Sequence, residues 1–213
     1  MTNLKFIKDI ISRLNWKIFP TTALSILSGI AIIPCILWLP EKYAFENSFF
    51  ENVQLVILAF AVIFALKNKN YKYLFRWFAM LSFILFLREI NCGRVLFPRE
   101  NAINSFYTWK EILSDYSYIP NTLYALFMLF TLGYFFIHRL YKTIWDYVKF
   151  AKFPAIDIIL FILGIILGTL GETLLPNEMF EETSETMFYL SFMSIIYLYT
   201  FNPQIVFNNK KKK

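Results

Sequence analysis

The sequence is poor in charge, in histidine and in cysteine, and each shortage removes a class of protein. Asp, Glu, Lys and Arg make up 17% of the 213 residues, whereas soluble domains carry about 25%. The single histidine, His138, gives no basis for a His-ligated metal or a Ser–His catalytic pair. The two cysteines, Cys35 and Cys92, belong to no CxxC or Cys/His motif, so zinc and thioredoxin-type chemistry are unsupported. We expect both to be free thiols rather than a disulfide.

Glycine is also scarce, with six residues in the chain. Neither G-x-x-x-x-G-K-[ST] nor G-x-G-x-x-G occurs, so the sequence gives no support for a nucleotide-binding loop. The net charge of +6 is compatible with a nucleic-acid partner. The basic residues are placed beside apolar segments, however, which argues against one.

What the chain has in excess is apolar length. Hydrophobic residues make up 58% of the sequence and aromatic residues 20%, and the mean hydropathy is +0.51. A membrane-spanning helix needs about 20 mostly apolar residues. The pattern predicts an all-α polytopic membrane helix bundle of about six transmembrane helices, and no soluble domain of useful size remains. The predicted spans are residues 19–40, 51–67, 73–88, 121–141, 154–176 and 184–202, of which 51–67 and 73–88 are the shortest.

The basic residues alternate with these spans, which predicts the orientation of the chain. Sixteen of the 21 lie before the first span, around the connections that follow the second and fourth spans, and at the end of the chain. Lys and Arg accumulate on the cytoplasmic side of membrane proteins, so both termini are expected in the cytoplasm, in the inner (plasma) membrane of a cell. The opposite side then carries five basic and twelve acidic residues. This distribution explains the net charge without nucleic acid and makes membrane lipids the expected partners.

Three segments flank or interrupt the transmembrane domain of residues 19–202. Residues 1–18 are expected to form an interfacial amphipathic helix, since apolar residues at 4, 7, 11, 14 and 18 share one helical face. Residues 203–213 are expected to form a basic cytoplasmic tail. The outer loop of residues 89–120 is rich in aromatic side chains, which fits either a lid over the mouth of the bundle or an ordinary interfacial loop.

Two features of the fifth span allow two interpretations each. Gly164, Gly168 and Gly171 form a stripe of small residues, which is typical of a close-packing face against another helix and less often of a binding site. A second copy of the chain is one candidate for that other helix. Asp157 lies in the first turn after Pro154, where an acid complements the helix dipole, and proton coupling is the alternative.

Ionisable residues concentrate where the chain meets the predicted outer side. Glu51 and Gln54 are three residues apart and share a helix face at the start of the second span. Arginines and a glutamate follow the third span, and glutamates at helical spacing lead into the sixth. Charge near hydrocarbon costs free energy unless it pairs, lines a wet cavity or has a function. The predicted polar cluster comprises Glu46, Glu51, Gln54, Arg88, Glu89, Arg94, Glu172, Glu182 and Glu185.

Two interpretations of this cluster are open. In the first, Arg88 and Arg94 pair with the glutamates and form an ion-pair clasp between helix ends, because a guanidinium can bind a carboxylate through two bonds. In the second, the excess of carboxylates forms an acidic cup. Such a cup would bind a hard divalent cation such as Ca²⁺, Mg²⁺ or Mn²⁺, an amine, or a lipid head group through the arginines.

These interpretations lead to three functional hypotheses. The leading one is a membrane protein that binds or transports a cation or a small polar or lipid ligand at its outer face. The alternative is a structural or accessory subunit of a membrane complex, with a protein partner or a second copy. A membrane-embedded enzyme that uses paired carboxylates is third, because nothing in the sequence selects a substrate. A non-enzymatic role is therefore favoured.

The same cluster carries a resemblance to a group of uncharacterised bacterial inner-membrane proteins. The shared features are an E-x-x-x-E-x-x-Q pattern that begins one helix, an R-E-[ILV]-x-x-G-R stretch after the next, and a glutamate-rich segment before the last. The upstream acid departs from that pattern, because position 47 is asparagine and Glu46 is out of register. The resemblance implies a bacterial multi-pass membrane protein and no particular activity. The matching residues are Glu51 and Gln54, then Arg88, Glu89, Gly93 and Arg94, then Glu172, Glu182 and Glu185.

Overall fold

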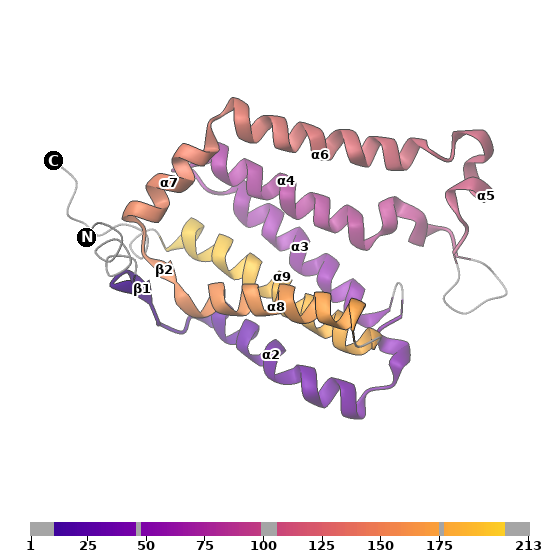
Figure 1. Ribbon diagram of the computed structural model, residues 1–213, viewed down its shortest axis with the longest axis horizontal. Coiled ribbons are helices and arrows are strands. Elements are labelled where there is room, and N and C mark those ends of the chain that lie inside the picture. Colours follow the sequence, from indigo (N-terminus) through magenta and orange to yellow (C-terminus); the bar gives the residue numbers. More distant parts are fainter. Residues whose placement is uncertain (1–10, 46–47, 99–105, 175–176, 203–213) are drawn as a thin grey trace.

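Six apolar stretches of the sequence form long helices in the computed structural model, which describes residues 11–45, 48–98, 106–174 and 177–202. These helices run back and forth between two ends of an all-helical bundle (Figure 1). Apolar side chains recur along each of them, and their backbone groups are bonded within the helix, as a helix in hydrocarbon requires. The long helices are α2 (Pro20–Trp38), α3 (Phe49–Leu66), α4 (Lys72–Glu89), α6 (Ile119–Ile137), α8 (Ala155–Thr173) and α9 (Glu178–Phe201).

Shorter elements lie at the two ends of the bundle (Figure 1). At one end are the helix α7 (Leu140–Phe150) and the two-residue strands β1 (Leu14–Asn15) and β2 (Phe153–Pro154), which pair in parallel. At the other end are the helix α5 (Trp109–Leu113) and the 3-10 helices η1 (Glu41–Tyr43), η2 (Asn91–Leu96) and η3 (Ser114–Tyr116).

Four of the long helices, α2, α3, α6 and α8, are long and apolar enough to cross a membrane. Large apolar side chains project from them into the surroundings, such as Ile33 on α2 and Ile137 on α6, which are 67% and 78% exposed. Apolar surface of this extent is unusual for a soluble monomer and marks a lipid or protein contact. The structure therefore supports a membrane protein with four apolar candidate spans. The predicted spans 73–88 and 184–202 coincide with α4 and α9, which are long helices of more polar composition.

The centre of the bundle is α9, which packs against α2, α3 and α8. Half of its 24 residues are buried, and its Tyr189 and Ile196 belong to the main hydrophobic core together with Leu58 of α3 and Phe75 of α4. Buried hydroxyls on α9 bond to its own backbone, as when Ser191 Oγ donates to the Met187 carbonyl at 2.8 Å. Such internal bonds satisfy polar side chains that would otherwise be costly to bury.

The glycine stripe of the fifth span is a packing face for α9 of the same chain. A Cβ added at Gly164 would lie 2.8 Å from the Phe188 Cα, and one at Gly171 would lie 3.0 Å from the Glu181 Cα. The prediction of a close-packing face is confirmed, since any larger side chain would separate α8 from α9. The idea that a second copy uses this face is wrong, because α9 covers it.

Asp157 stands in the first turn of α8 and also joins α8 to α2. Its side chain is 1% exposed, and its Oδ2 accepts a hydrogen bond from Thr22 Oγ1 of α2 at 2.8 Å. On the same side, Ser194 Oγ of α9 donates to Thr21 Oγ1 at 2.8 Å. The position in the first turn of α8 is the one expected for an acid that complements the helix dipole. The bond to α2 is a tertiary contact that the sequence did not reveal.

The predicted N-terminal helix of residues 1–18 is wrong for residues 12–18, while residues 1–10 lie outside the described part. Leu14–Asn15 form β1, and the Phe153 N–H donates to the Arg13 carbonyl at 3.0 Å. Backbone pairing with β2 therefore replaces the helical bonds here. The chain stays extended at Phe19, because the residue before a proline is disfavoured in the helical region and Pro20 begins α2. The predicted basic tail, 203–213, also lies outside the described residues.

Two helices have boundaries that differ from those of the predicted spans. The span predicted as 121–141 stops at Ile137, because Arg139 adopts a left-handed conformation with φ of 51° and α7 starts in a new direction. The span predicted to start at residue 184 belongs to a helix that starts at Glu178, where the Asn177 side chain accepts a hydrogen bond from the Phe180 N–H at 2.9 Å. The glutamates before the last predicted span are therefore helical.

Candidate functional site

The predicted polar cluster gathers at the end of the bundle where α3 and α9 begin and α4 ends (Figure 1). We call this the acidic end and define it by Glu51 of α3, Glu89 of α4, and Glu182 and Glu185 of α9. Glu51 and Glu89 are 8% and 6% exposed. Glu51 stands in the first turn of α3, where the helix dipole favours an acid. The packing of α3 against both α4 and α9 brings these residues together from distant parts of the sequence.

Arg88 makes two ion pairs, one with Glu89 of its own helix and one with Glu185, which links α4 to α9. Its Nε donates to Glu89 Oε1 at 3.1 Å, and its Nη2 donates to Glu185 Oε1. The Arg88 side chain is 50% exposed, whereas those of Glu89 and Glu185 are 5% and 18% exposed. The buried Tyr189 hydroxyl donates to the same Glu89 oxygen at 2.5 Å. Charge-assisted bonds of this kind fix the guanidinium in one orientation.

Gln54 lies beneath these charges with none of its surface exposed. Its Nε2 donates to the Glu182 carbonyl at 3.0 Å, to Glu182 Oε2 at 2.9 Å and to Thr186 Oγ1 at 3.3 Å. Its Oε1 has no hydrogen-bond partner among the described residues. A buried acceptor without a donor costs about 1–3 kcal/mol and is rare in folded proteins. Gln54 therefore adds one more acceptor to a region that is already rich in them.

Burial and crowding change the protonation of the two carboxyls that lie just outside the predicted spans 73–88 and 184–202. Burial raises the pKa of Glu182 to about 8, and the neighbouring Glu185, Glu89 and Glu51 add to the rise while the Gln54 bond opposes it. Burial also raises the pKa of Glu89, against the opposing charge of Arg88. At neutral pH the Glu182 carboxyl is therefore largely protonated.

A cavity of about 310 Å³ opens beside Arg88. Arg94 lines it too, because the chain between the two arginines turns sharply, with φ of 46° at Asn91, 54° at Cys92 and 95° at Gly93. A left-handed conformation costs roughly 1–2 kcal/mol for an ordinary L-residue, and such strain gathers at functional sites. The remaining walls are the side chains of Asn91, Cys92, Trp109, Asn121 and Tyr124.

The structure does not unite every predicted residue. Glu172 at the end of α8 is exposed, and the bonds described above do not include it. Glu46 lies outside the described residues. Arg94 joins the cluster by lining the cavity. The others, Glu51, Gln54, Arg88, Glu89, Glu182 and Glu185, meet at the acidic end.

Several residues of the site are not among those that the sequence pattern predicts. Tyr189 stands four residues after Glu185 on the same helix face, so helical spacing was a signal that could have found it. Trp109 belongs to α5, within the predicted outer loop, and Asn121 and Tyr124 belong to α6. Their approach depends on how residues 106–121 fold back, which no local pattern encodes.

The side chains that could ligate a metal ion, and the two cysteines, are considered next. Within the described ranges, no three acidic, histidine or cysteine side chains are placed to share a metal ion. Cys35 and Cys92 are free thiols, as expected, and burial raises the pKa of Cys92, which keeps it protonated at neutral pH.

No protein-family model, no curated protein and no solved structure matches this chain. Its function therefore has to be inferred from the geometry of the site.

Proposed function

We propose that the chain is a multi-pass membrane protein that binds a small zwitterionic ligand at the acidic end. The anionic group of the ligand would contact Arg88 and Arg94 in the cavity, and its cationic group would face the carboxylate of Glu185, the ion-pair partner of Arg88. The observation that carries this proposal is the double role of Arg88, which lines the cavity while Glu89 and Glu185 hold its guanidinium.

The charges of the site favour a ligand with both signs. A bare anion would meet the arginines but would be repelled by the neighbouring carboxylates, and a bare cation would meet the opposite problem. Two unit charges 4 Å apart interact with about 4 kcal/mol near a protein surface, so an unmatched neighbour can cancel an ion pair. The indole of Trp109 and the phenol of Tyr124 line the same cavity and offer an apolar wall with polar edges.

The same proposal includes the membrane topology. Six spans with both termini in the cytoplasm would place the acidic end on the outer face of the inner (plasma) membrane of a bacterium. Two observations support it. The basic side chains of the turn between α3 and α4 lie at the end opposite the acidic end, and α9, the central helix, packs against three apolar helices that would shield it from lipid.

The test uses the purified chain in detergent and three probes: inorganic phosphate, ethanolamine and phosphoethanolamine, which joins the two groups. Phosphoethanolamine is expected to raise the melting temperature saturably and more than the sum of its halves. Arg94→Gln should weaken that response by about tenfold or more in apparent Kd, since one charge-assisted contact contributes about 1.5–3 kcal/mol. Lys110→Gln, at an exposed lysine of α5, is the matched control and should leave the response unchanged.

Two outcomes would overturn the zwitterion proposal. One is that none of the three probes stabilises the wild-type chain. The other is that phosphate alone is as effective as phosphoethanolamine in both the wild type and the Glu185→Gln variant, which would make the site a plain anion site.

A second function has its own support. Arg88 to Glu185, Tyr189 to Glu89 and Gln54 to Glu182 all join α3 or α4 to α9, as an ion-pair clasp in a structural or accessory subunit would. In that case none of the three probes would shift the melting temperature, and the chain would copurify with a partner protein. The ligand site is favoured instead if phosphoethanolamine stabilises the wild type and Arg94→Gln weakens that response with little change in the stability of the unliganded chain.

A further inference from the structure

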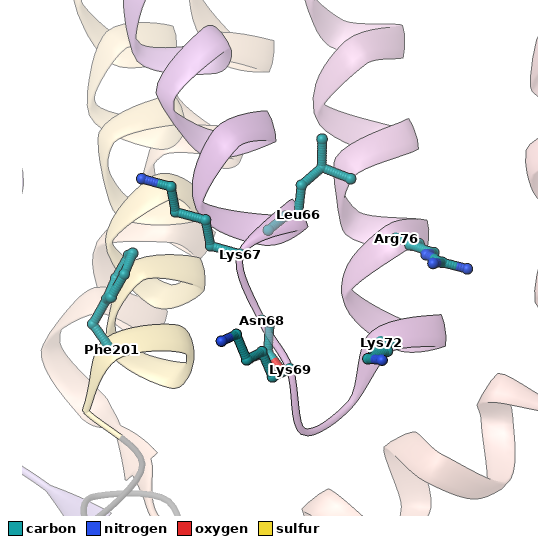
Figure 2. A pocket seen from close by; sticks show the side chains of 8 residues that line it. Leu66, Lys67, Asn68, Lys69, Lys72, Arg76 and Phe201 are labelled. Atoms are coloured by element: carbon teal, nitrogen blue, oxygen red, sulfur yellow. The ribbon is translucent and has the colours of Figure 1, made fainter.

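The opposite end of α3, α4 and α9 carries a cavity that the proposed function does not use. It has a volume of about 640 Å³ and lies around the turn between α3 and α4, beside the last residue of α9 (Figure 2). Four of the residues that line it are cationic, namely Lys67, Lys69, Lys72 and Arg76, and none of its described lining residues is acidic. We call this the basic cavity.

The turn that carries these cations is held in place by one amide. Asn68 is 5% exposed, and its Nδ2 donates to the Tyr199 carbonyl at 3.3 Å and to Thr200 Oγ1 at 3.4 Å. Its Oδ1 accepts from the N–H groups of Asn70 at 3.1 Å and Tyr71 at 3.0 Å. The turn is therefore attached to the end of α9, and the lysines project from a fixed backbone.

The basic cavity also has an apolar side. Leu66 at the end of α3 and Phe201 at the end of α9 line it and are 61% and 43% exposed. Since α3 is apolar enough to cross a membrane, the cavity lies where an apolar helix surface gives way to cations. Figure 2 shows Phe201 on one side of the turn and Arg76 on the other. Of the cations, Lys72 and Arg76 belong to α4, whereas Lys67 and Lys69 belong to the turn itself.

We propose that the basic cavity binds the head group of an anionic phospholipid, with its acyl chains along Leu66 and Phe201. Lysines act as point charges toward phosphate, and arginine adds a fork of donors. Basic pockets beside membrane helices are suited to such head groups, with about 1 kcal/mol for each cation near the surface. A free phosphate would use the cations but not the exposed apolar side chains, so the cavity favours the lipid.

The experiment titrates the purified full chain in a neutral detergent with short-chain phosphatidylglycerol, with phosphatidylcholine of the same chain length, and with inorganic phosphate. Phosphatidylglycerol is expected to raise the melting temperature saturably, and the other two are not. The double variant Lys67→Gln/Lys69→Gln should weaken the apparent affinity for phosphatidylglycerol about 25-fold, at about fivefold for each cation. The double variant Lys142→Gln/Lys149→Gln removes two exposed lysines of α7 outside the cavity and should keep the wild-type affinity.

Three results would overturn this proposal: no response of the wild type to phosphatidylglycerol, an equal response to phosphate, or an equal loss in the two double variants, which would indicate general surface charge. If the double variant of the cavity fails to fold, Lys69→Gln alone supplies the comparison through a fivefold loss. The phosphoethanolamine response of the acidic end should be the same in all these variants, so the two sites are tested separately.

Discussion

The acidic end and the basic cavity lie at opposite ends of the same three helices, yet they hold charge in different ways. At the acidic end the charged groups are part of the packing, since Glu51 and Glu89 are buried and Arg88 bridges to α9. At the basic cavity the lysines are exposed, and the buried polar group is the neutral amide of Asn68. Buried charge is costly unless it is paired, while exposed charge costs little. Stability should therefore depend on charge at one end and on an amide at the other.

The largest expected effect comes from breaking the ion pairs of Arg88. Arg88→Met leaves the buried Glu89 carboxylate without its arginine and removes the bridge to Glu185. The free energy of unfolding should fall by about 2–3 kcal/mol, toward the lower limit for a broken buried pair because Arg88 is half exposed. Lys69→Met, at an exposed lysine of the basic cavity, should change it by less than about 0.5 kcal/mol. Unfolding in a denaturing detergent measures the free energy of unfolding of both variants. Equal losses would contradict the expectation that charge contributes more to stability at the acidic end than at the basic cavity.

A smaller effect is expected from the amide at the basic end. Asn68→Ala removes the bonds to α9 and to the turn, and it should cost about 1–2 kcal/mol in the same unfolding measurement. Asn70→Ala, two residues along on the exposed side of the turn, is the matched control and should cost less than about 0.5 kcal/mol. If the two variants were equally destabilised, the turn would not depend on the buried amide.

The smallest effect is a pH dependence that belongs to the acidic end. The pKa of Glu182 is raised to about 8 in the folded chain, while an unfolded glutamate titrates near about 4.3. Between these values the folded state holds a proton that the unfolded state has lost, so stability falls as pH rises from about 5 to about 8. Glu182→Gln should reduce that fall by about 1 kcal/mol.

Other groups that face Glu182 also affect its pKa and therefore the dependence of stability on pH. Glu51 of α3, Glu89 of α4 and Glu185 of α9 raise the pKa of its carboxyl, and Gln54 lowers it. Lys69→Gln at the other end should leave the slope of stability against pH as it is in the wild type. A wild-type slope in the Glu182→Gln variant would assign the effect to one of the neighbouring carboxyls.

The sequence was most informative where one local rule acts alone. Apolar length predicts the positions of all six long helices, and helical spacing predicts that Glu182 and Glu185 share one face. Counting charged residues in the connections between spans also predicts that basic and acidic side chains lie at opposite ends of the bundle. These features depend on neighbours within one or two helical turns, which the sequence displays directly.

Tertiary contacts explain what could not be predicted. Residues 14–15 have a helical apolar pattern but pair with Phe153–Pro154, 139 positions away, so the partner decides their structure. The cavity beside Arg88 depends on three consecutive positive φ angles at Asn91, Cys92 and Gly93, of which only the glycine is a recognisable signal. The walls from α5 and α6 are contributed by Trp109, Asn121 and Tyr124, which are at least 15 positions from Arg94 in the sequence.

The hydroxyl-rich face of α9 has a consequence for how the protein is made. Thr183, Ser184, Thr186 and Ser191 each bond to a carbonyl of the preceding turn, and Ser194 bonds to α2. A segment of this kind has little tendency to leave water for lipid by itself. Because α9 follows α2, α3 and α8 in the chain, it would meet these helices already in the bilayer. Biogenesis would then run from the outer helices inward, with the central one completing the assembly.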